Sequence, residues 1–515
     1  MKTVMDRIEV RKRRVAAHPF YTWLGEARSP LARRFDFAPV LVNFIMAFSD
    51  MNKWFMRYAA PASAYERAIN RHTHEDERHS RLFIEDWRKL GLDERLGWTA
   101  GETLAWYHAA PETEPFRAHG MRIVEMLVGD DDPLIRFALM ESIEAWGHVM
   151  FAASAAVATR LSGASGVEYR YFGPYHLKRE LGHLLGGACL FEGASLDEDR
   201  RARALALVDR FFDIADDESD RLLAYARAAV DGEPAAHVSA DVVTRAPARR
   251  VASHAHDRLV FGPPRIQRVL DERRRTAAEH PLLAWMQAGG DPARKLRQLA
   301  LFWAPDCLGY RDLNLHALTY AEPRGPEARA INRRVAALGT HHRLFLADWA
   351  ALDMDRALGF TASDTLEFYC RSRHSEVQRE SMAEFLKLAF RHPEPALRHW
   401  LLVALEASGE AFFAGTRALA TRVERTLGVR LDYLADRHDV AERMAPQADD
   451  PEADAVSFRG FPLTSAQEEV AVAMIHTVFD RLDLQLSRSL EQATSERFVG
   501  EPAARGWHDR ARVAV

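Results

Sequence analysis

The 515-residue chain carries the same long pattern twice, and this duplication constrains its fold more than any other feature. When the sequence is shifted by 262 positions, the stretch from His18 to Glu180 aligns with the second half without a gap. The segment INRHTHEDERHSRLFIEDW at 69–87 returns as INRRVAALGTHHRLFLADW at 331–349. A period of this length is far longer than that of a solenoid repeat. We therefore expect a tandem duplication of a whole domain.

The duplication sets the expected domain boundaries. We expect a first domain over residues 1–230, a second domain over 257–496 and a tail over 497–515. Residues 231–256, between the two domains, show no hydrophobic periodicity, which is typical of a linker.

The composition excludes several classes of protein. The chain is 48% hydrophobic with a net charge of −5, which excludes wholesale disorder and argues against a strongly basic nucleic-acid-binding surface. Its three cysteines show no CxxC spacing, so neither a disulfide framework nor a thiolate zinc site is expected. The apolar runs fall short of the roughly 20 residues that a membrane-spanning helix needs, and no secretory signal is recognisable. We expect a cytoplasmic protein that binds neither nucleic acid nor membrane.

Hydrophobic periodicity predicts helices throughout. Apolar residues recur at i, i+3, i+4 and i+7 in four long stretches, Phe37–Phe55, Ile69–Leu90, Pro133–Leu161 and Arg201–Ala229. Alternating β-branched runs bounded by turn signals are absent from the sequence. We therefore expect two all-α bundles of about seven helices each.

The motif HLKRELGH is the strongest candidate for chemistry in the first copy. On a helix at 100° per residue, His176, Glu180 and His183 lie at 0°, 40° and −20°, so they share one stripe. Imidazole and carboxylate ligands on one stripe suit iron, manganese or zinc. The alternative interpretation is a polar helix face with incidental histidines.

Two further segments carry candidate ligands. His72, Asp76 and His79 share one face of a predicted helix, although a charge run of this kind is usually a solvated surface. Glu144 lies in an apolar stretch and must be paired, hydrogen-bonded or bound to a metal. Asp50 is a candidate for an additional ligand or a residue that supports the ligands.

The second copy indicates which of these positions tolerate change. Four candidates are retained in the second copy, as His341, Glu406, His438 and Glu442. Three are lost, since His72, Asp76 and His183 become Arg334, Leu338 and Ala445. Replacement of an aspartate by leucine indicates that this position faces packing rather than water.

Together these motifs resemble the heme-oxygenase-like diiron oxidases and oxygenases. The resemblance covers most of the first half and implies a heme-oxygenase-like bundle in each copy. It implies metal ligands at five positions, His79, Glu144, His176, Glu180 and His183. The family's remaining carboxylate falls on His72, where Asp76 or Glu75 could substitute. The same residues also fit a ferritin-like diiron pattern, made of Asp50, Asp76-x-x-His79, Glu144 and Glu180-x-x-His183. Glu144 and Asp50 are the residues expected to be catalytic.

The resemblance also implies a function. Two iron ions in the first domain, with manganese or a mixed metal pair as the alternative, would activate O2 to oxidise a small organic substrate. N-oxygenation, desaturation and C–C cleavage stay open as reactions, and the electron donor is unknown. The second copy is expected to be catalytically silent and to pack on the first as a pseudo-dimer, with a higher oligomer left open.

Three other functions compete with this one. A heme-binding or heme-degrading protein of the same fold would need a proximal histidine, for which His18 is available. A metal-free enzyme would use the polar residues as a substrate pocket. A scaffolding protein would carry the clusters as surface decoration, which the expected burial of Glu144 argues against.

Overall fold

The computed structural model describes residues 1–26, 30–179, 190–191, 193–231, 263–438 and 463–495. These residues form helices and turns and contain no strand, so the prediction of an all-α protein is confirmed for the part of the chain described. Within the same ranges, no helix combines the length and the apolar character that crossing a membrane requires. The predicted linker beyond residue 231 and the predicted tail lie outside the described residues.

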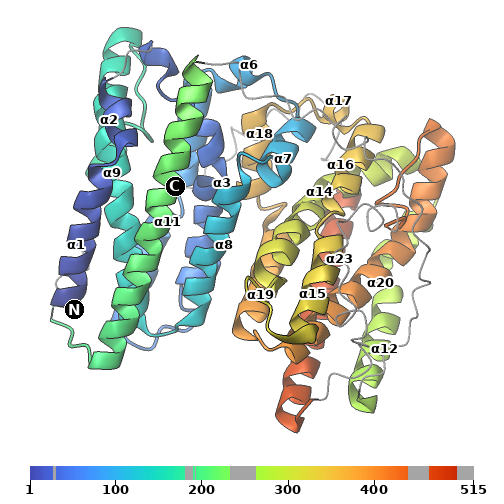
Figure 1. The fold of residues 1–515 in the computed structure, drawn as a ribbon. Helices are drawn as coiled ribbons and strands as arrows, with labels where there is room; N and C mark the ends of the chain where they lie inside the picture. The colour runs from blue at the N-terminus through green and yellow to red at the C-terminus, as the bar shows by residue number, and fades with distance from the viewer. Residues whose placement is uncertain (27–29, 180–189, 192, 232–262, 439–462, 496–515) are drawn as a thin grey trace. The chain divides into compact units, whose positions relative to one another are not determined.

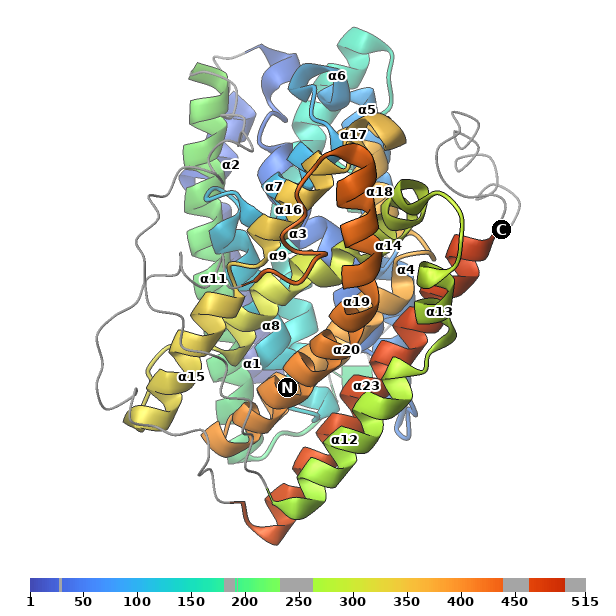
Figure 2. The same ribbon diagram turned by 90° about the vertical axis from the view of Figure 1, so that its right-hand side faces the viewer.

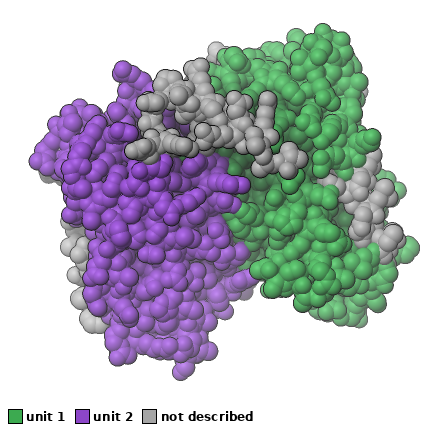
Figure 3. Space-filling model, turned by 180° about the vertical axis from the view of Figure 1, so that it is seen from behind, with its two compact units in different colours: residues 1–98, 109–237, 361–371 green, residues 99–108, 238–360, 372–515 purple. Residues whose placement is uncertain are grey.

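The chain divides into two compact units, coloured separately in Figure 3. Unit 1 comprises Met1–Trp98, Ala109–His237 and Thr361–Arg371, and unit 2 comprises Thr99–His108, Val238–Phe360 and Ser372–Val515. Most of the first repeat therefore falls in unit 1, and most of the second falls in unit 2. One short helix of each repeat is assigned to the other unit.

Three long helices lie side by side in unit 1 (Figure 1), namely α1 (Lys2–Ala16), α9 (Pro133–Ser165) and α11 (Glu198–Asp231). Unit 1 also contains α2 (Pro19–Glu26), α3 (Ala38–Asp50), α4 (Ala64–Asp76), α5 (His79–Lys89), α6 (Leu92–Leu96), α8 (Glu114–Gly129), α18 (Ala362–Arg371) and a helical segment over 174–179. A π-helical segment, Met51–Met56, continues α3, and a 3-10 turn spans Leu31–Arg33.

Unit 2 is built on the same plan. Its long helices α12 (Pro264–Ala278), α20 (Pro395–Leu427) and α23 (Ser465–Thr494) lie side by side (Figure 2). The other helices are α7 (Ala100–Ala109), α13 (Pro281–Gln287), α14 (Pro292–Asp312), α15 (Gly325–Leu338), α16 (His342–Ala351), α17 (Met354–Leu358) and α19 (Glu376–Arg391). A π-helical segment, Leu313–Leu318, continues α14.

The central helix of each unit begins and ends at equivalent residues. Asp132 caps α9 by accepting a hydrogen bond from the Leu134 amide at 2.9 Å, directly before a proline at the first helical position. Gly166 ends α9 with a φ of 71°, and Gly428 ends α20 with a φ of 69°. A left-handed residue at this position is easiest for glycine, because it has no Cβ.

A single helix over Ile69–Leu90, which the periodicity predicts, is wrong. The structure has two helices there, because α4 ends at Asp76 and α5 begins at His79. The terminal carbonyl groups of α4 accept hydrogen bonds from other segments, with Arg57 donating to Thr73 O at 2.8 Å and Ser49 donating to Glu77 O. These side chains satisfy the helix end without a glycine or a proline in the sequence.

Candidate metal centre

A group of three potential ligands joins α4 to α9 in unit 1. His72 and Asp76 are one helical turn apart, and His72 Nε2 lies 3.0 Å from Asp76 Oδ2. The same nitrogen lies 3.1 Å from Glu144 Oε1. One ligand atom of each residue lies within 4.8 Å of the other two, and the side chains are buried or nearly so.

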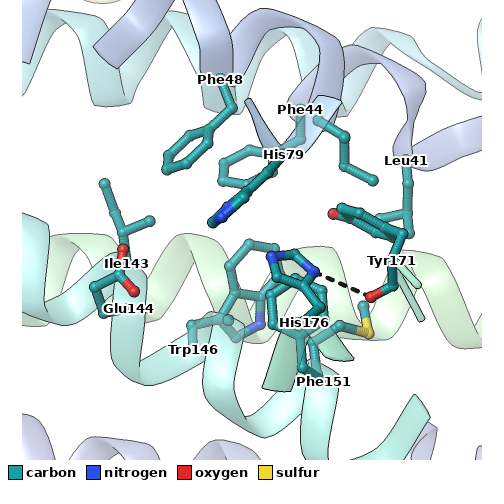
Figure 4. Close-up of a pocket in the computed structure, with 13 residues that line it drawn as sticks. Leu41, Phe44, Phe48, His79, Ile143, Glu144, Trp146, Phe151, Tyr171 and His176 are labelled. Atoms are coloured by element: carbon teal, nitrogen blue, oxygen red, sulfur yellow. Dashed lines mark hydrogen bonds between the residues drawn. The ribbon is translucent and has the colours of Figure 1, made fainter. Parts of the chain in front are cut away.

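Two further histidines extend this group. His79 begins α5, and its Nδ1 lies 3.8 Å from Asp76 Oδ1. The His79 and His176 rings pack in a T-shaped arrangement with 4.3 Å between centroids, and Figure 4 shows them side by side. His72, Asp76, His79, Glu144 and His176, which the sequence predicts as ligands, therefore form one continuous cluster.

The orientation of His176 is fixed by its backbone partner. His176 lies in the helical segment 174–179, is fully buried, and has its Nδ1 3.0 Å from the carbonyl oxygen of Tyr171. Because a carbonyl can only accept, Nδ1 carries the proton and Nε2 carries the lone pair. This is the arrangement that a metal-binding imidazole adopts.

Asp86 holds the loop that supplies this carbonyl. Its carboxylate accepts backbone hydrogen bonds from Arg170 at 2.9 Å, Tyr171 at 2.8 Å and Phe172 at 3.0 Å. Asp86 is completely buried on α5, about two turns after His79. The Asp86 carboxylate therefore fixes the loop that orients His176 relative to α5, the helix that carries His79.

An apolar cavity of about 60 Å³ opens beside the cluster (Figure 4). Its polar groups are contributed by His79, Glu144, His176 and Tyr171. The rest of the lining comes from α3 and α9 and is apolar: Leu41, Phe44, Ile45, Phe48, Ile143, Trp146, Gly147, Met150 and Phe151. The cavity has room for a few water-sized groups.

The electrostatics of the cluster favour a cation. Burial disfavours a charged imidazole at His72, but the negative charges of Glu144 and Asp76 outweigh this effect and hold its pKa well above the usual value. The cluster therefore binds a proton tightly at the point where the two carboxylates converge. Two carboxylates and an imidazole are also a donor set that suits iron, manganese or zinc, so these residues fit a transition metal.

Glu141 is a buried carboxyl that the sequence analysis did not select. It lies on α9, one turn before Glu144, and burial raises its pKa to about 7 against the opposing charges of His72 and Lys12. The equivalent residue of the second copy is Val403. This change from a carboxylate to an apolar residue between the two copies is a sequence signal that the position is buried, as is the change from Asp76 to Leu338.

The remaining predicted residues of the first copy lie elsewhere. Glu180 and His183 lie outside the described residues. Asp50 is half-buried at the end of α3. Among the described residues, neither the cavity lining nor the three-ligand group includes it.

Unit 2 keeps the framework of the cluster but not its chemistry. His341 and His438 face each other with 4.6 Å between ring centroids. Arg334 forms a bidentate ion pair with Glu406, donating from Nε to one carboxylate oxygen and from Nη2 to the other. Glu442, the fourth retained candidate, lies outside the described residues.

Comparison with known proteins gives no family. No family model matches the chain, and no curated protein matches it.

Proposed function

We propose that unit 1 is a non-heme dimetal oxidase or oxygenase of the heme-oxygenase-like class, with iron as the preferred metal. The observation that carries this proposal is the convergence of His72, Asp76 and Glu144 within 4.8 Å, in contact with the His79–His176 pair. Bound iron would supply a redox-active centre that reacts with O2.

The chain's own residues would hold and orient the metal ions. Asp76 and Glu144 provide the negative charge, and the imidazoles of His72, His79 and His176 provide nitrogen donors. The Tyr171 carbonyl keeps His176 in the tautomer whose Nε2 can bind a metal. Because His72 lies between two carboxylates, metal binding there must displace its proton, so the affinity for metal falls in acid.

The cavity beside the cluster indicates the kind of substrate. Its walls, including Phe44, Phe48 and Trp146, are apolar and would exclude water from the reacting group. Among the residues that the structure describes, no lysine or arginine lines this cavity. We infer that unit 1 oxidises an uncharged apolar group, either a small organic molecule or one end of a longer molecule.

The heme alternative is less well supported by the structure. His18 Nδ1 accepts a hydrogen bond from the Phe20 amide at 3.2 Å, and His18 Nε2 lies 3.0 Å from Asp220 Oδ1. His18 therefore contacts the first turn of α2 through Nδ1 and α11 through Nε2, and neither nitrogen is available to a heme iron without breaking these contacts.

Oxygen consumption tests the proposed function. The purified chain is loaded with Fe(II) anaerobically and mixed with O2, and an oxygen electrode measures the rate of O2 uptake. The variants His79→Ala and His341→Ala, which change equivalent positions of the two copies, are compared with the wild type. We expect uptake by the wild type and by His341→Ala, and at least a tenfold slower uptake by His79→Ala. Equal uptake by the two variants, or none by the wild type, would contradict the proposal.

A further inference from the structure

We infer that Arg334 serves in unit 2 as a built-in replacement for a metal ion, so that this unit keeps the framework of the metal centre but excludes metals. The inference rests on the proposed function of unit 1. It begins with equivalent positions, because Arg334 and Glu406 correspond to His72 and Glu144 after the shift of 262 residues.

The contact between the two helices is retained while its chemistry changes. In unit 1 an imidazole nitrogen of α4 lies 3.1 Å from the carboxylate of Glu144 on α9. In unit 2 the guanidinium of Arg334 on α15 donates hydrogen bonds to both carboxylate oxygens of Glu406 on α20. A bidentate guanidinium satisfies both oxygens of the carboxylate, which a metal ion would otherwise need as a ligand.

The balance of charge changes in the same direction. Unit 1 brings together two carboxylates, Asp76 and Glu144, and such a pair is favourable when a divalent cation joins it. In unit 2, Leu338 stands at the position of the first carboxylate, and the positive charge of Arg334 neutralises the negative charge of Glu406. A divalent cation placed here would add positive charge beside a guanidinium that cannot lose its proton.

In unit 2, residues at some of the positions that line the unit 1 cavity form hydrogen bonds with other side chains of the same unit. Leu41, Phe44 and Trp146 correspond to Trp303, Asp306 and Ser408. Trp303 Nε1 donates to Ser489 Oγ at 3.1 Å, and Gln485 Nε2 donates to Asp306 Oδ1 at 2.9 Å. Both contacts are buried and join α14 to α23. Two positions that line the cavity in unit 1 are therefore engaged, in unit 2, in buried contacts between its own side chains.

A reversal experiment tests the inference. In a chain whose unit 1 centre is removed by His72→Ala and Glu144→Gln, the pair Arg334→His and Leu338→Asp restores the unit 1 residue types in unit 2. The metal bound after incubation with Co²⁺ and gel filtration is measured by mass spectrometry. We expect no bound Co²⁺ in the background chain and stoichiometric Co²⁺ after the reversal.

The control places the same residue types one position away. Arg333→His with Ala337→Asp turns them by about 100° around α15, so no Co²⁺ should bind. Co²⁺ retained by the background chain and lost on His438→Ala would overturn the inference, as would a folded reversal variant that binds none. Wild-type Co²⁺ binding that His72→Ala leaves unchanged would instead contradict the proposed function.

A melting experiment decides the matter if the reversal variant does not fold. Glu406→Gln removes the charged partner of Arg334 and should lower the melting temperature of unit 2, which identifies the unfolding transition that belongs to this unit. In the wild type, we expect Co²⁺ to leave the midpoint of the unit 2 transition unchanged. Co²⁺ should raise the midpoint of the unit 1 transition, and His72→Ala should abolish that rise. A Co²⁺-dependent rise in the unit 2 transition would overturn the inference.

Discussion

His72 Nε2 lies 3.1 Å from Glu144 Oε1, and this contact joins two helices through residues that are 72 positions apart in the chain. The imidazole also contacts Asp76, so one side chain connects both carboxylates of the cluster. Its proton occupies the place where positive charge is most favourable. The two carboxylates therefore stabilise a protonated imidazole between them, and the proposal that a metal ion can take this place can be tested.

Asp86 is expected to be necessary both for stability and for metal binding. The change Asp86→Ala leaves three backbone N–H groups without their acceptor, so the free energy of unfolding should fall by about 3 kcal/mol. Because Tyr171 holds His176, Co²⁺ affinity should also fall. The control is Asp348→Ala, whose carboxylate accepts from Asp432 N and Leu434 N in unit 2. Denaturation by urea and Co²⁺ titration measure both effects, and equal Co²⁺ affinity in the two variants would contradict this role.

Glu141 should give unit 1 a distinct pH dependence. Its pKa is about 7 in the folded chain and 4.5 as the reference value, so folding binds a proton between these values. Stability attributable to this carboxyl therefore falls as the pH rises from 4.5 to 7, by about 3 kcal/mol at most, and is constant above that window.

Glu141→Gln should remove this pH dependence, since the amide does not titrate. In metal-free protein, the variant should gain stability over the wild type as the pH rises to 8 and should match it below pH 4.5. Chemical denaturation at several pH values measures the difference. A difference between the two proteins that does not change with pH would show that Glu141 does not titrate in this window.

Tyr21 is expected to support the cavity from outside. Trp146 lines the cavity, and its Nε1 donates to Tyr21 Oη at 3.0 Å in a buried contact. Tyr21→Phe leaves this N–H without an acceptor and should cost about 1–2 kcal/mol of unfolding free energy. Tyr58→Phe is the control, because Tyr58 Oη donates to Asp131 O in an exposed contact and its loss should cost less than about 0.5 kcal/mol. Equal losses would contradict the argument.

Asp93 is expected to anchor α18 within unit 1. Its carboxylate accepts from Trp87 Nε1 at 2.8 Å, from Ser363 N at 2.9 Å and from Ser363 Oγ at 2.6 Å. Asp93→Ala should lower the free energy of unfolding by about 2 kcal/mol, since it removes a helix cap and the partner of a buried indole. Glu94→Ala, at the exposed neighbouring position, should be nearly neutral. Thermal melting of the two variants tests the difference.

The duplication and the periodicity made much of the fold predictable. The π-helical segments Met51–Met56 and Leu313–Leu318 stand 262 positions apart, as the repeat requires. The break between α4 and α5 could not be predicted, because Ser49 and Arg57 reach the helix end from another segment. The placement of α18 in unit 1 likewise depends on contacts distant in sequence.

The candidate site was predictable to a similar degree. Glu144 stood out because a carboxylate in an apolar stretch needs a partner, and His72 provides it. Glu141 did not stand out: its change to Val403 in the second copy was a signal, but its raised pKa follows from burial that only the packed helices create. The ion pair of Arg334 with Glu406 was also unforeseen, because the sequence showed the loss of a histidine but not what the arginine would contact.

The most direct test of the central claim is a Co²⁺ titration of the full chain, followed by the visible absorption of the bound ion. Under the proposed function, the wild type and His341→Ala bind Co²⁺ alike, while His72→Ala and Glu144→Gln each weaken binding at least tenfold. Absence of Co²⁺ binding by the wild type, or unchanged affinity in His72→Ala and Glu144→Gln, would contradict a metal centre built on these two residues.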